Sequence, residues 1–198
     1  MGSNPSEFKD DPQNPVEQVS WDDVQGFLRE VEKRVPGVKA ALPTEAEWEY
    51  ACRGGSETAF SWGDEIDPSW ANYDGTYSYA DGPTGEYRAK TVPVKSFEPN
   101  AWGLYQMHGN VDEWCSDGRR EYDGALQVDP RGPTGDAPRA VRGGSWLDHP
   151  HGLRAACRLV RPHVRRGDFQ GFRFSLRSTS GPEGSAERPP EAAVTRDA

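Results

Sequence analysis

The sequence predicts an α+β fold that is sparse in regular secondary structure, with two main helices and short antiparallel strands. The 198 residues include 22 glycines and 17 prolines, a content that favours turns and short strands over a helical bundle. Helical periodicity is confined to two segments in the first third of the chain. Seven Trp, seven Tyr and seven Phe supply large apolar units for a core, although only 34% of the residues are hydrophobic.

The first predicted helix begins after Ser20 and ends near Val35. Ser20 and Asp23 have the spacing of a capping box, in which each side chain bonds the backbone of the other residue. Val24 and Leu28 belong to one apolar stripe that faces the core. We expect this helix to be part of the scaffold.

The second predicted helix begins after Thr44 and runs to Arg53. Thr44 and Glu47 repeat the capping-box spacing. Gly54 follows the last helical residue, which is where glycine commonly ends a helix. Beyond it the periodicity disappears, and the short strand candidates are 91–97, 103–107, 139–146 and 171–176. We expect one domain over residues 1–177 and a disordered tail over 178–198, where no apolar periodicity remains.

Charge and hydropathy exclude several classes of function. The net charge of −9 argues against nucleic-acid binding, which requires clustered lysines and arginines. No stretch approaches the length of a membrane span, so we expect no membrane partner. No secretory leader is visible at Met1, and the default expectation is a cytoplasmic compartment. Cys52, Cys115 and Cys157 are too few for a disulfide framework and lack zinc-type spacing.

Four segments carry a resemblance to a known family. They are residues 15–21 (PVEQVSW), 42–49 (LPTEAEWE), 100–111 (NAWGLYQMHGNV) and 142–146 (RGGSW), and the last is followed by Arg154, Arg158 and Arg173. In this order they resemble motifs of the formylglycine-generating enzyme, or sulfatase-modifying factor, family. The resemblance implies a C-type-lectin-like fold, and we expect the three arginines to hold loops through bidentate hydrogen bonds.

The resemblance also implies that the family's N-terminal strand and helix are missing from this chain. Met1 corresponds to an internal position in many relatives. A domain without an early strand would expose a sheet edge or an apolar groove. We therefore expect either reduced stability or a partner chain that completes the missing N-terminal portion.

The family's oxidation chemistry depends on two cysteines in the loop after the Gly-Gly-Ser motif, where their thiolates bind copper(I). Here Asp148 takes the place of the first cysteine, and the shorter loop has no counterpart of the second. Copper(I) requires soft ligands, so copper and formylglycine generation are not expected. Other catalytic candidates in this loop are Ser145, His149 and His151, with Asp148 as a further oxygen ligand for a harder metal.

Calcium is the cofactor that the resemblance implies, in a structural role. The first predicted site uses the carbonyls of His108, Gly109 and Val111 and the carboxylate of Glu113. The position before Glu113 usually carries Trp in relatives but is Asp112 here, and a carboxylate there would either strengthen cation binding or face solvent. The second predicted site uses Asn72, Tyr73 and an acid from the next loop, with Glu86 preferred and Asp74 and Asp81 as alternatives.

Three functions remain open. The first is a catalytically divergent family member that acts in a biosynthetic or protein-modifying pathway. The second is a module that binds a protein, peptide or small-molecule ligand, and that resembles retroelement-diversified variable proteins; its predicted binding face is Trp146, His149, His151, Arg165, Arg166 and Phe169. The third is an active formylglycine generator, which requires two of the three cysteines to converge.

Overall fold

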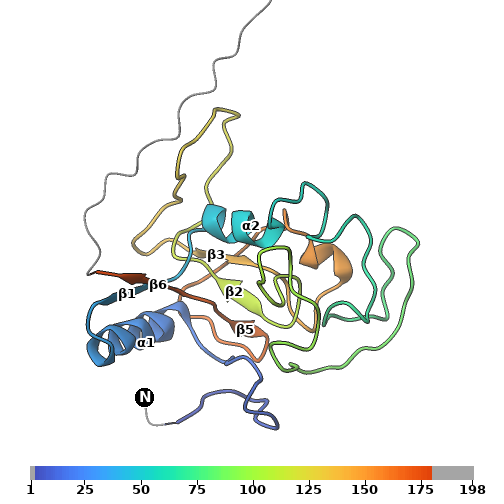
Figure 1. The fold of residues 1–198 in the computed structure, drawn as a ribbon, viewed down its shortest axis with the longest axis horizontal. Helices are drawn as coiled ribbons and strands as arrows, with labels where there is room; N and C mark the ends of the chain where they lie inside the picture. Colours follow the sequence, from blue (N-terminus) through green and yellow to red (C-terminus); the bar gives the residue numbers. More distant parts are fainter. Residues whose placement is uncertain (1–2, 180–198) are drawn as a thin grey trace, which may run out of the picture.

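A computed structural model of the chain describes residues 3–179. Two α-helices, one 3-10 helix and six short strands are joined by long loops (Figure 1). In chain order they are α1 (Trp21–Arg34), β1 (Val38–Ala41), α2 (Glu45–Arg53), β2 (Asp112–Trp114), β3 (Arg139–Arg142), η1 (Pro150–Leu153), β4 (Leu159–Arg161), β5 (Gln170–Gly171) and β6 (Ser175–Ser178). This architecture confirms the predicted fold class. No helix within residues 3–179 is long and apolar enough to cross a membrane.

Both predicted helices are confirmed together with their caps. The Ser20 hydroxyl accepts a hydrogen bond from the Asp23 N–H, and the Asp23 carboxylate accepts one from the Ser20 N–H. Thr44 and Glu47 form the same reciprocal pair at the start of α2. Gly54 ends α2 with a φ of 55°, in the left-handed region that favours glycine.

The strands form two sheets. β1 and β6 pair antiparallel beside α1, and the second sheet has the order β4-β3-β2-β5 at the centre of the molecule (Figure 1). β2 and β5 pair in parallel, in contrast to the predicted antiparallel arrangement, and the long connection through β3 and β4 makes this parallel pairing possible.

Several strand predictions are wrong. Residues 91–97 and 103–107 contain no strand, and 139–146 is extended only over β3. The 171–176 candidate is divided between β5 and β6. β6 continues to Ser178, one residue beyond the predicted domain boundary, and residues 180–198 of the predicted tail lie outside the described residues. Elements of two to four residues are too short to give a period-2 pattern.

Three apolar clusters form the core. One lies beneath α1, and a second surrounds Trp48 and Cys52 of α2. The third joins Phe60 and Tyr73 to Leu153 of η1. Trp114 and Trp146 are buried as core anchors, and their ring N–H groups donate to the carbonyls of Val19 and Asp168 at 3.0 and 3.1 Å. Trp102, which belongs to the third family motif, is by contrast 47% exposed.

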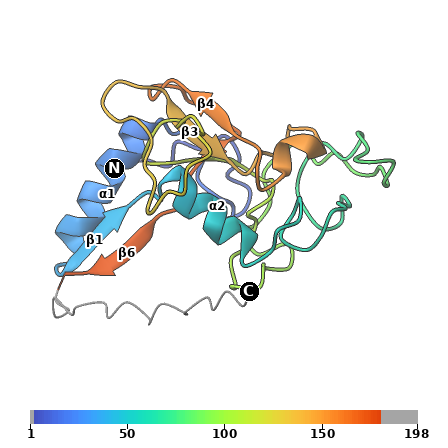
Figure 2. The same cartoon turned by 90° about the horizontal axis from the view of Figure 1, so that it is seen from above.

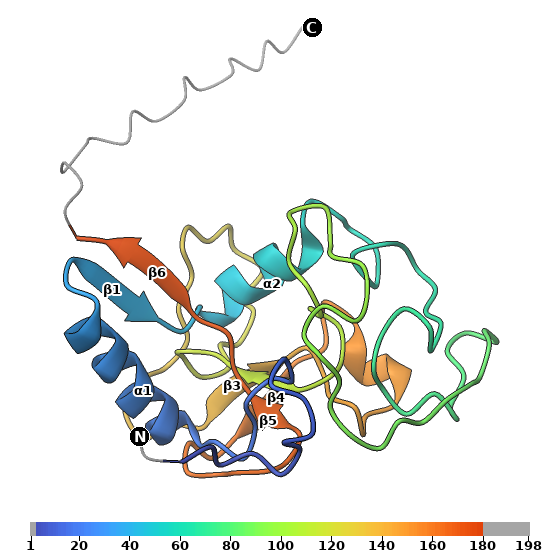
Figure 3. The same cartoon turned by 60° about the horizontal axis from the view of Figure 1, so that its bottom comes forward.

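Residues 54–87 form a separate feature that we call the loop lobe. Figures 1 and 2 show it, in teal to green, on the side of the molecule away from α1. The N-terminal segment 3–19 runs between α1 and the lobe side of the molecule (Figure 3), where the Gln18 N–H donates to the Gly167 carbonyl at 2.9 Å. The third apolar cluster joins the lobe to the loop 145–153. These two segments, together with the centre of the sheet, contain the candidate site.

Candidate functional site

The loop after β3 is shaped by two glycines. Gly143 and Gly144 have φ values of 93° and 72°, and a Cβ on Gly144 would lie 2.9 Å from Leu153. The chain then turns sharply, and the Asp148 carboxylate accepts hydrogen bonds from the N–H and the hydroxyl of Ser145 at 2.8 and 2.5 Å. Asp148, which stands where the family's first cysteine is predicted, thus closes its own turn.

The two histidines of this loop do not converge with Asp148 on a metal site. His149 stacks on Tyr77 with ring centroids 3.6 Å apart, and His151 lies 4.8 Å from Tyr79. Both histidines are exposed. Within residues 3–179, no group of three or more His, Cys, Asp or Glu side chains is arranged to hold a metal ion. The imidazole rings of His149 and His151 instead contact aromatic rings of the loop lobe.

Asp112 lies buried on β2 close to this loop. Its side chain is fully shielded from solvent, and within the described part of the chain neither carboxylate oxygen has a hydrogen-bond partner. Arg161 on β4 is its ion-pair partner, but at 3.7 Å. Burial, reinforced by the negative charge of Asp148, raises the pKa of Asp112 to about 8. This carboxyl group is therefore largely protonated at neutral pH.

The surroundings of Asp112 contain other unsatisfied polar atoms. The side-chain oxygen of buried Gln170 and the Nε of Arg161 also lack partners in the part of the chain that the structure describes. Gln170 on β5 is the registered neighbour of Asp112. Sequence reasoning considered Asp112 only as a calcium ligand or a solvated residue, and it missed Arg161 and Gln170. The one available signal was the replacement of the usual Trp by Asp112 within a matched motif.

The cysteines do not offer a copper(I) site at the loop. Cys52 and Cys115 are buried in the cluster beneath α2, and Cys157 is partly buried. Burial raises the pKa of all three thiols, that of Cys52 to about 12. Thiolates are the form that binds copper(I), and these environments disfavour them. The residues present therefore do not fit the family's metal.

The first predicted calcium set surrounds a carboxylate that is already engaged. Glu113 accepts hydrogen bonds from Nε and Nη2 of Arg173 at 2.5 and 2.7 Å and from the ring N–H of Trp48 at 2.6 Å. The Gly109 carbonyl accepts from the Val111 N–H at 3.1 Å. In this arrangement the set has no free anionic oxygen for a hard cation, so it fits calcium poorly.

His108, from the same set, has a structural side chain. Its Nδ1 lies 2.7 Å from the Leu153 carbonyl, and its Nε2 accepts from the Ser61 N–H at 3.0 Å. Burial lowers the pKa of His108 to about 4, so the ring is neutral. The ring joins η1 to the loop lobe.

The second predicted calcium set fits better. Asn72 is buried, and its side-chain oxygen has no hydrogen-bond partner among residues 3–179, while its amide donates to the Lys90 carbonyl at 2.9 Å. Asp74 pairs with Tyr87 in an isolated bridge, which brings Glu86 back beside the Asn72–Tyr73 segment. Asp81 lies instead near the turn closed by the hydrogen bond from Gly82 to Tyr79. The backbone arrangement therefore favours Glu86 over Asp81 as the acid of this set. Glu86 forms one exposed ion pair with Arg88 at 3.3 Å, so a cation would compete only with that single contact, unlike at Glu113.

The predicted binding face is divided into two parts. Trp146 is only 8% exposed, and it packs against Phe8 and Tyr87. His149 and His151 lie on the lobe side. Arg166 instead pairs with Asp23 of α1 at 2.7 Å, and Arg165 lies over the Phe169 ring at 5.5 Å.

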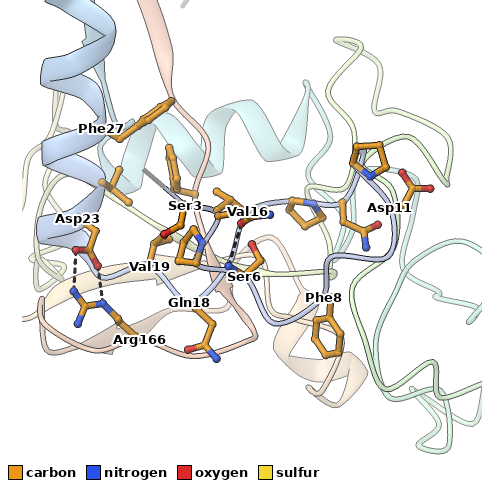
Figure 4. A pocket seen from close by; sticks show the side chains of 17 residues that line it. Ser3, Ser6, Phe8, Asp11, Val16, Gln18, Val19, Asp23, Phe27 and Arg166 are labelled. Atoms are coloured by element: carbon orange, nitrogen blue, oxygen red, sulfur yellow. Dashed lines mark hydrogen bonds and ion pairs between the residues drawn. The ribbon is translucent and has the colours of Figure 1, made fainter. Parts of the chain in front are cut away.

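An apolar groove of about 640 Å³ lies between the N-terminal segment and α1 (Figure 4). Its walls include Val16, Val24, Phe27 and Phe172, and the Asp23–Arg166 ion pair lies at its rim. The partner chain that would fill the groove remains a prediction.

Three arginines were predicted to hold loops. Arg158 binds Glu45 through two hydrogen bonds of 2.6 and 2.5 Å, and Arg173 binds Glu113 in the same bidentate manner. Arg154 is exposed and donates only to the His151 carbonyl, at 3.2 Å. Two of the three therefore have the predicted geometry.

Comparisons with known proteins agree with the motifs. The model of the sulfatase-modifying factor enzyme 1-like domain matches residues 1–177. The formylglycine-generating enzyme of Streptomyces coelicolor is 42% identical over 145 residues, which cover 70% of this chain and 44% of that enzyme. The chain spans about half the length of the curated relatives it matches.

Solved structures give the same answer for the fold. The Treponema denticola variable protein 1 aligns with a TM-score of 0.74 and 26% identity, covering 89% of this chain and 78% of that one. PvdO from Pseudomonas aeruginosa aligns with a TM-score of 0.71 and 31% identity, covering 86% and 64%. The chain therefore belongs to the sulfatase-modifying factor enzyme 1-like domain family, as its four motifs predicted.

Proposed function

We propose that this domain binds a protein, peptide or small-molecule ligand through the lobe side of its loops, and that it does not perform copper-dependent formylglycine generation. The observation that carries the proposal is the state of the loop 145–153. Asp148 bonds Ser145, while His149 and His151 lie exposed on aromatic rings. Exposed aromatic and histidine side chains on a packed scaffold suit recognition.

The replaced thiol supports the second half of the proposal. A carboxylate is a hard ligand and does not substitute for a thiolate toward copper(I). The three cysteines of the chain have raised pKa values because of burial. The resemblance of the fold to a variable protein is consistent with ligand recognition, although that name describes the other protein.

Selection of peptides from a random library on the immobilised domain would test the binding function. We expect enriched peptides whose affinity falls at least tenfold in Tyr77→Ala and His149→Ala variants. Arg165→Ala is a matched control, because Arg165 is exposed but lies on the other part of the predicted face. Enriched peptides that bind all three variants equally, or no enrichment at all, would contradict the proposal.

Asp112 favours one second candidate, a divergent enzyme. The Asp112 oxygens have no hydrogen-bond partner among residues 3–179, and burial raises the pKa of this carboxyl group. The group is shielded in this structure, so a divergent enzyme requires movement of the covering loop before Asp112 can donate a proton to a substrate. Mass spectrometry of the selected peptides after incubation would decide between the two. A mass change that disappears in Asp112→Asn supports an enzyme, and recovery of unchanged peptide supports a binding module.

We also propose calcium as a structural cofactor at the second set. The support is the buried, unpartnered oxygen of Asn72 and the return of Glu86 to its vicinity. Calcium should raise the unfolding temperature relative to a chelator, and Asn72→Ala should abolish that increase. An equal calcium effect in Asn72→Ala would place the ion elsewhere.

A further inference from the structure

The loop lobe has an unusual composition. Residues 54–87 contain seven acidic and seven aromatic side chains and no Lys, Arg or His. The chain's net charge of −9, less the lobe's −7, leaves only −2 for the other 164 residues. The acidic residues are Glu57, Asp64, Glu65, Asp67, Asp74, Asp81 and Glu86. The negative charge of the molecule is thus concentrated on one protruding feature.

Four aromatic rings of the lobe are exposed although the lobe is packed. Trp62 and Tyr87 are each 40% exposed, and Trp70 and Tyr77 are each 47% exposed. Trp62 stacks on buried Phe60, with ring centroids 5.6 Å apart, and forms an edge-to-face contact with Trp70, with centroids 6.2 Å apart. The ring N–H of Trp62 donates to the Glu65 carbonyl at 2.8 Å. These contacts hold the rings in place, so a ligand would order few side chains on binding.

Most acids of the lobe form no ion pair within residues 3–179, although the flanking Arg53 and Arg88 donate to carbonyls of the lobe. Among the described residues, only Glu86 of the seven forms an ion pair, with Arg88 at 3.3 Å. Elsewhere in the fold, acids such as Glu45 and Glu113 have arginine partners. An exposed group of unpaired carboxylates creates a negative potential that attracts cations and raises association rates.

The lobe contacts the loop 145–153, which carries the proposed binding function. Tyr77 stacks on His149, and Tyr79 contacts His151. Figures 1 and 2 place the loop lobe on the side of the molecule away from α1. Arg166 instead pairs with Asp23 of α1. The lobe therefore has both exposed aromatic rings and exposed carboxylates, most of which form no ion pair among the described residues.

We infer that the loop lobe docks a cationic, arginine-rich protein segment. Guanidinium groups stack on aromatic faces and bond carboxylates through two N–H groups, and this surface presents both features. Nucleic acids and anionic membranes would be repelled by the same charge. The inference rests on the proposed binding function and specifies the chemistry of its ligand.

Binding of a fluorescein-labelled octaarginine peptide to the full chain tests this inference. We expect saturable binding that is tighter than that of octalysine, that weakens with salt, and that is absent for octaglutamate. The variant Glu57→Gln/Glu65→Gln/Asp81→Asn should bind octaarginine at least tenfold more weakly. These three side chains are exposed, so the variant should unfold at the wild-type temperature.

A second surface supplies the matched control. Glu121→Gln/Asp129→Asn/Asp136→Asn removes the same charge from exposed positions on the loop before β3 and should change affinity less than twofold. Trp70→Ala should weaken binding severalfold without a change in charge. Equal weakening in both triple variants, or no octaarginine binding, would overturn the inference. Neutral peptides that are selected on the domain and depend on Tyr77 would also overturn it, while leaving the binding function intact.

Discussion

Asp112 and Glu113 are consecutive carboxylates on β2, and both are buried, yet their surroundings are opposite. Glu113 receives three hydrogen bonds from Arg173 and Trp48. Asp112 receives none from the described residues, and its nearest cation is 3.7 Å away. Consecutive strand residues point to opposite faces of a sheet. β2 thus carries one buried carboxylate that is paired and one that is unsatisfied.

The difference shows where this chain departs from its scaffold. Paired buried charges such as Glu113–Arg173 and Glu45–Arg158 hold the matched motifs together. The unsatisfied carboxylate is that of Asp112, whose pKa is raised by burial and by the charge of Asp148. Asp112 and Asp148 are two of the positions where the resemblance indicates a departure from the family pattern. Native proteins tolerate such violations chiefly at functional sites.

Glu113→Ala should produce the largest effect, because it leaves Arg173 and the Trp48 N–H without their partner. Removing one member of a buried ion pair costs about 3–5 kcal/mol of unfolding free energy. Urea unfolding at pH 7 measures this loss. The control Glu30→Ala removes an exposed pair with Lys33, which should cost less than about 0.5 kcal/mol. Comparable losses in the two variants would show that the Glu113 pair stabilises the fold no more than an exposed pair does.

Asp112→Asn should have the opposite effect and raise the free energy of unfolding at neutral pH. The pKa of Asp112 is raised in the folded state, so the unfolded chain holds fewer protons than the folded chain between about pH 4 and 8. Stability is therefore fully present below the unfolded pKa and falls as pH rises through this window, by up to about 1.4 kcal/mol per pH unit. The variant should lose this slope, and its free energy of unfolding at pH 7 should exceed that of the wild type by at least about 2 kcal/mol.

Unfolding free energies measured from pH 4 to 9 for wild type and Asp112→Asn test this prediction. Loss of the slope in the variant is the expected result. An identical slope in both proteins would show that Asp112 is ionised and solvated in the fold, and the contrast with Glu113 would disappear.

Asp148→Asn should have the smallest effect. It keeps a side-chain oxygen that can accept from Ser145 but removes the negative charge that raises the pKa of Asp112. The upper end of the pH slope should shift downward by less than about one pH unit, because burial is the larger cause. The same pH series measures the shift, and an upward shift would contradict it.

The sequence was sufficient for the helices and the family but not for the sheet. Ser20 and Thr44 fix helix starts through local hydrogen bonds, and Gly54 fixes an end through its own backbone, so these features can be read locally. β2 and β5 contain three and two residues. They are extended only because distant segments pair with them, which a local pattern cannot reveal.

The site was predictable in its replaced residue but not in its contacts. Asp148 could be placed from the Gly-Gly-Ser motif, whereas its bond to Ser145 and the stacking of His149 on Tyr77 depend on tertiary structure. The position before Glu113 marked Asp112 as unusual. Its burial beside Arg161 required the approach of β4, which was not a predicted strand.

We propose that the loop after Gly143 and Gly144 does not support the copper chemistry of the family, because Asp148 stands where the resemblance places the first cysteine. The most direct measurement titrates the purified chain with copper(I) and then follows a cysteine-containing peptide under oxygen by mass spectrometry, beside the Streptomyces coelicolor enzyme. We predict no tight stoichiometric copper(I) binding and an unchanged peptide, because a carboxylate stands where a thiolate is required. A tight one-to-one complex with conversion of the peptide cysteine to formylglycine would contradict the account.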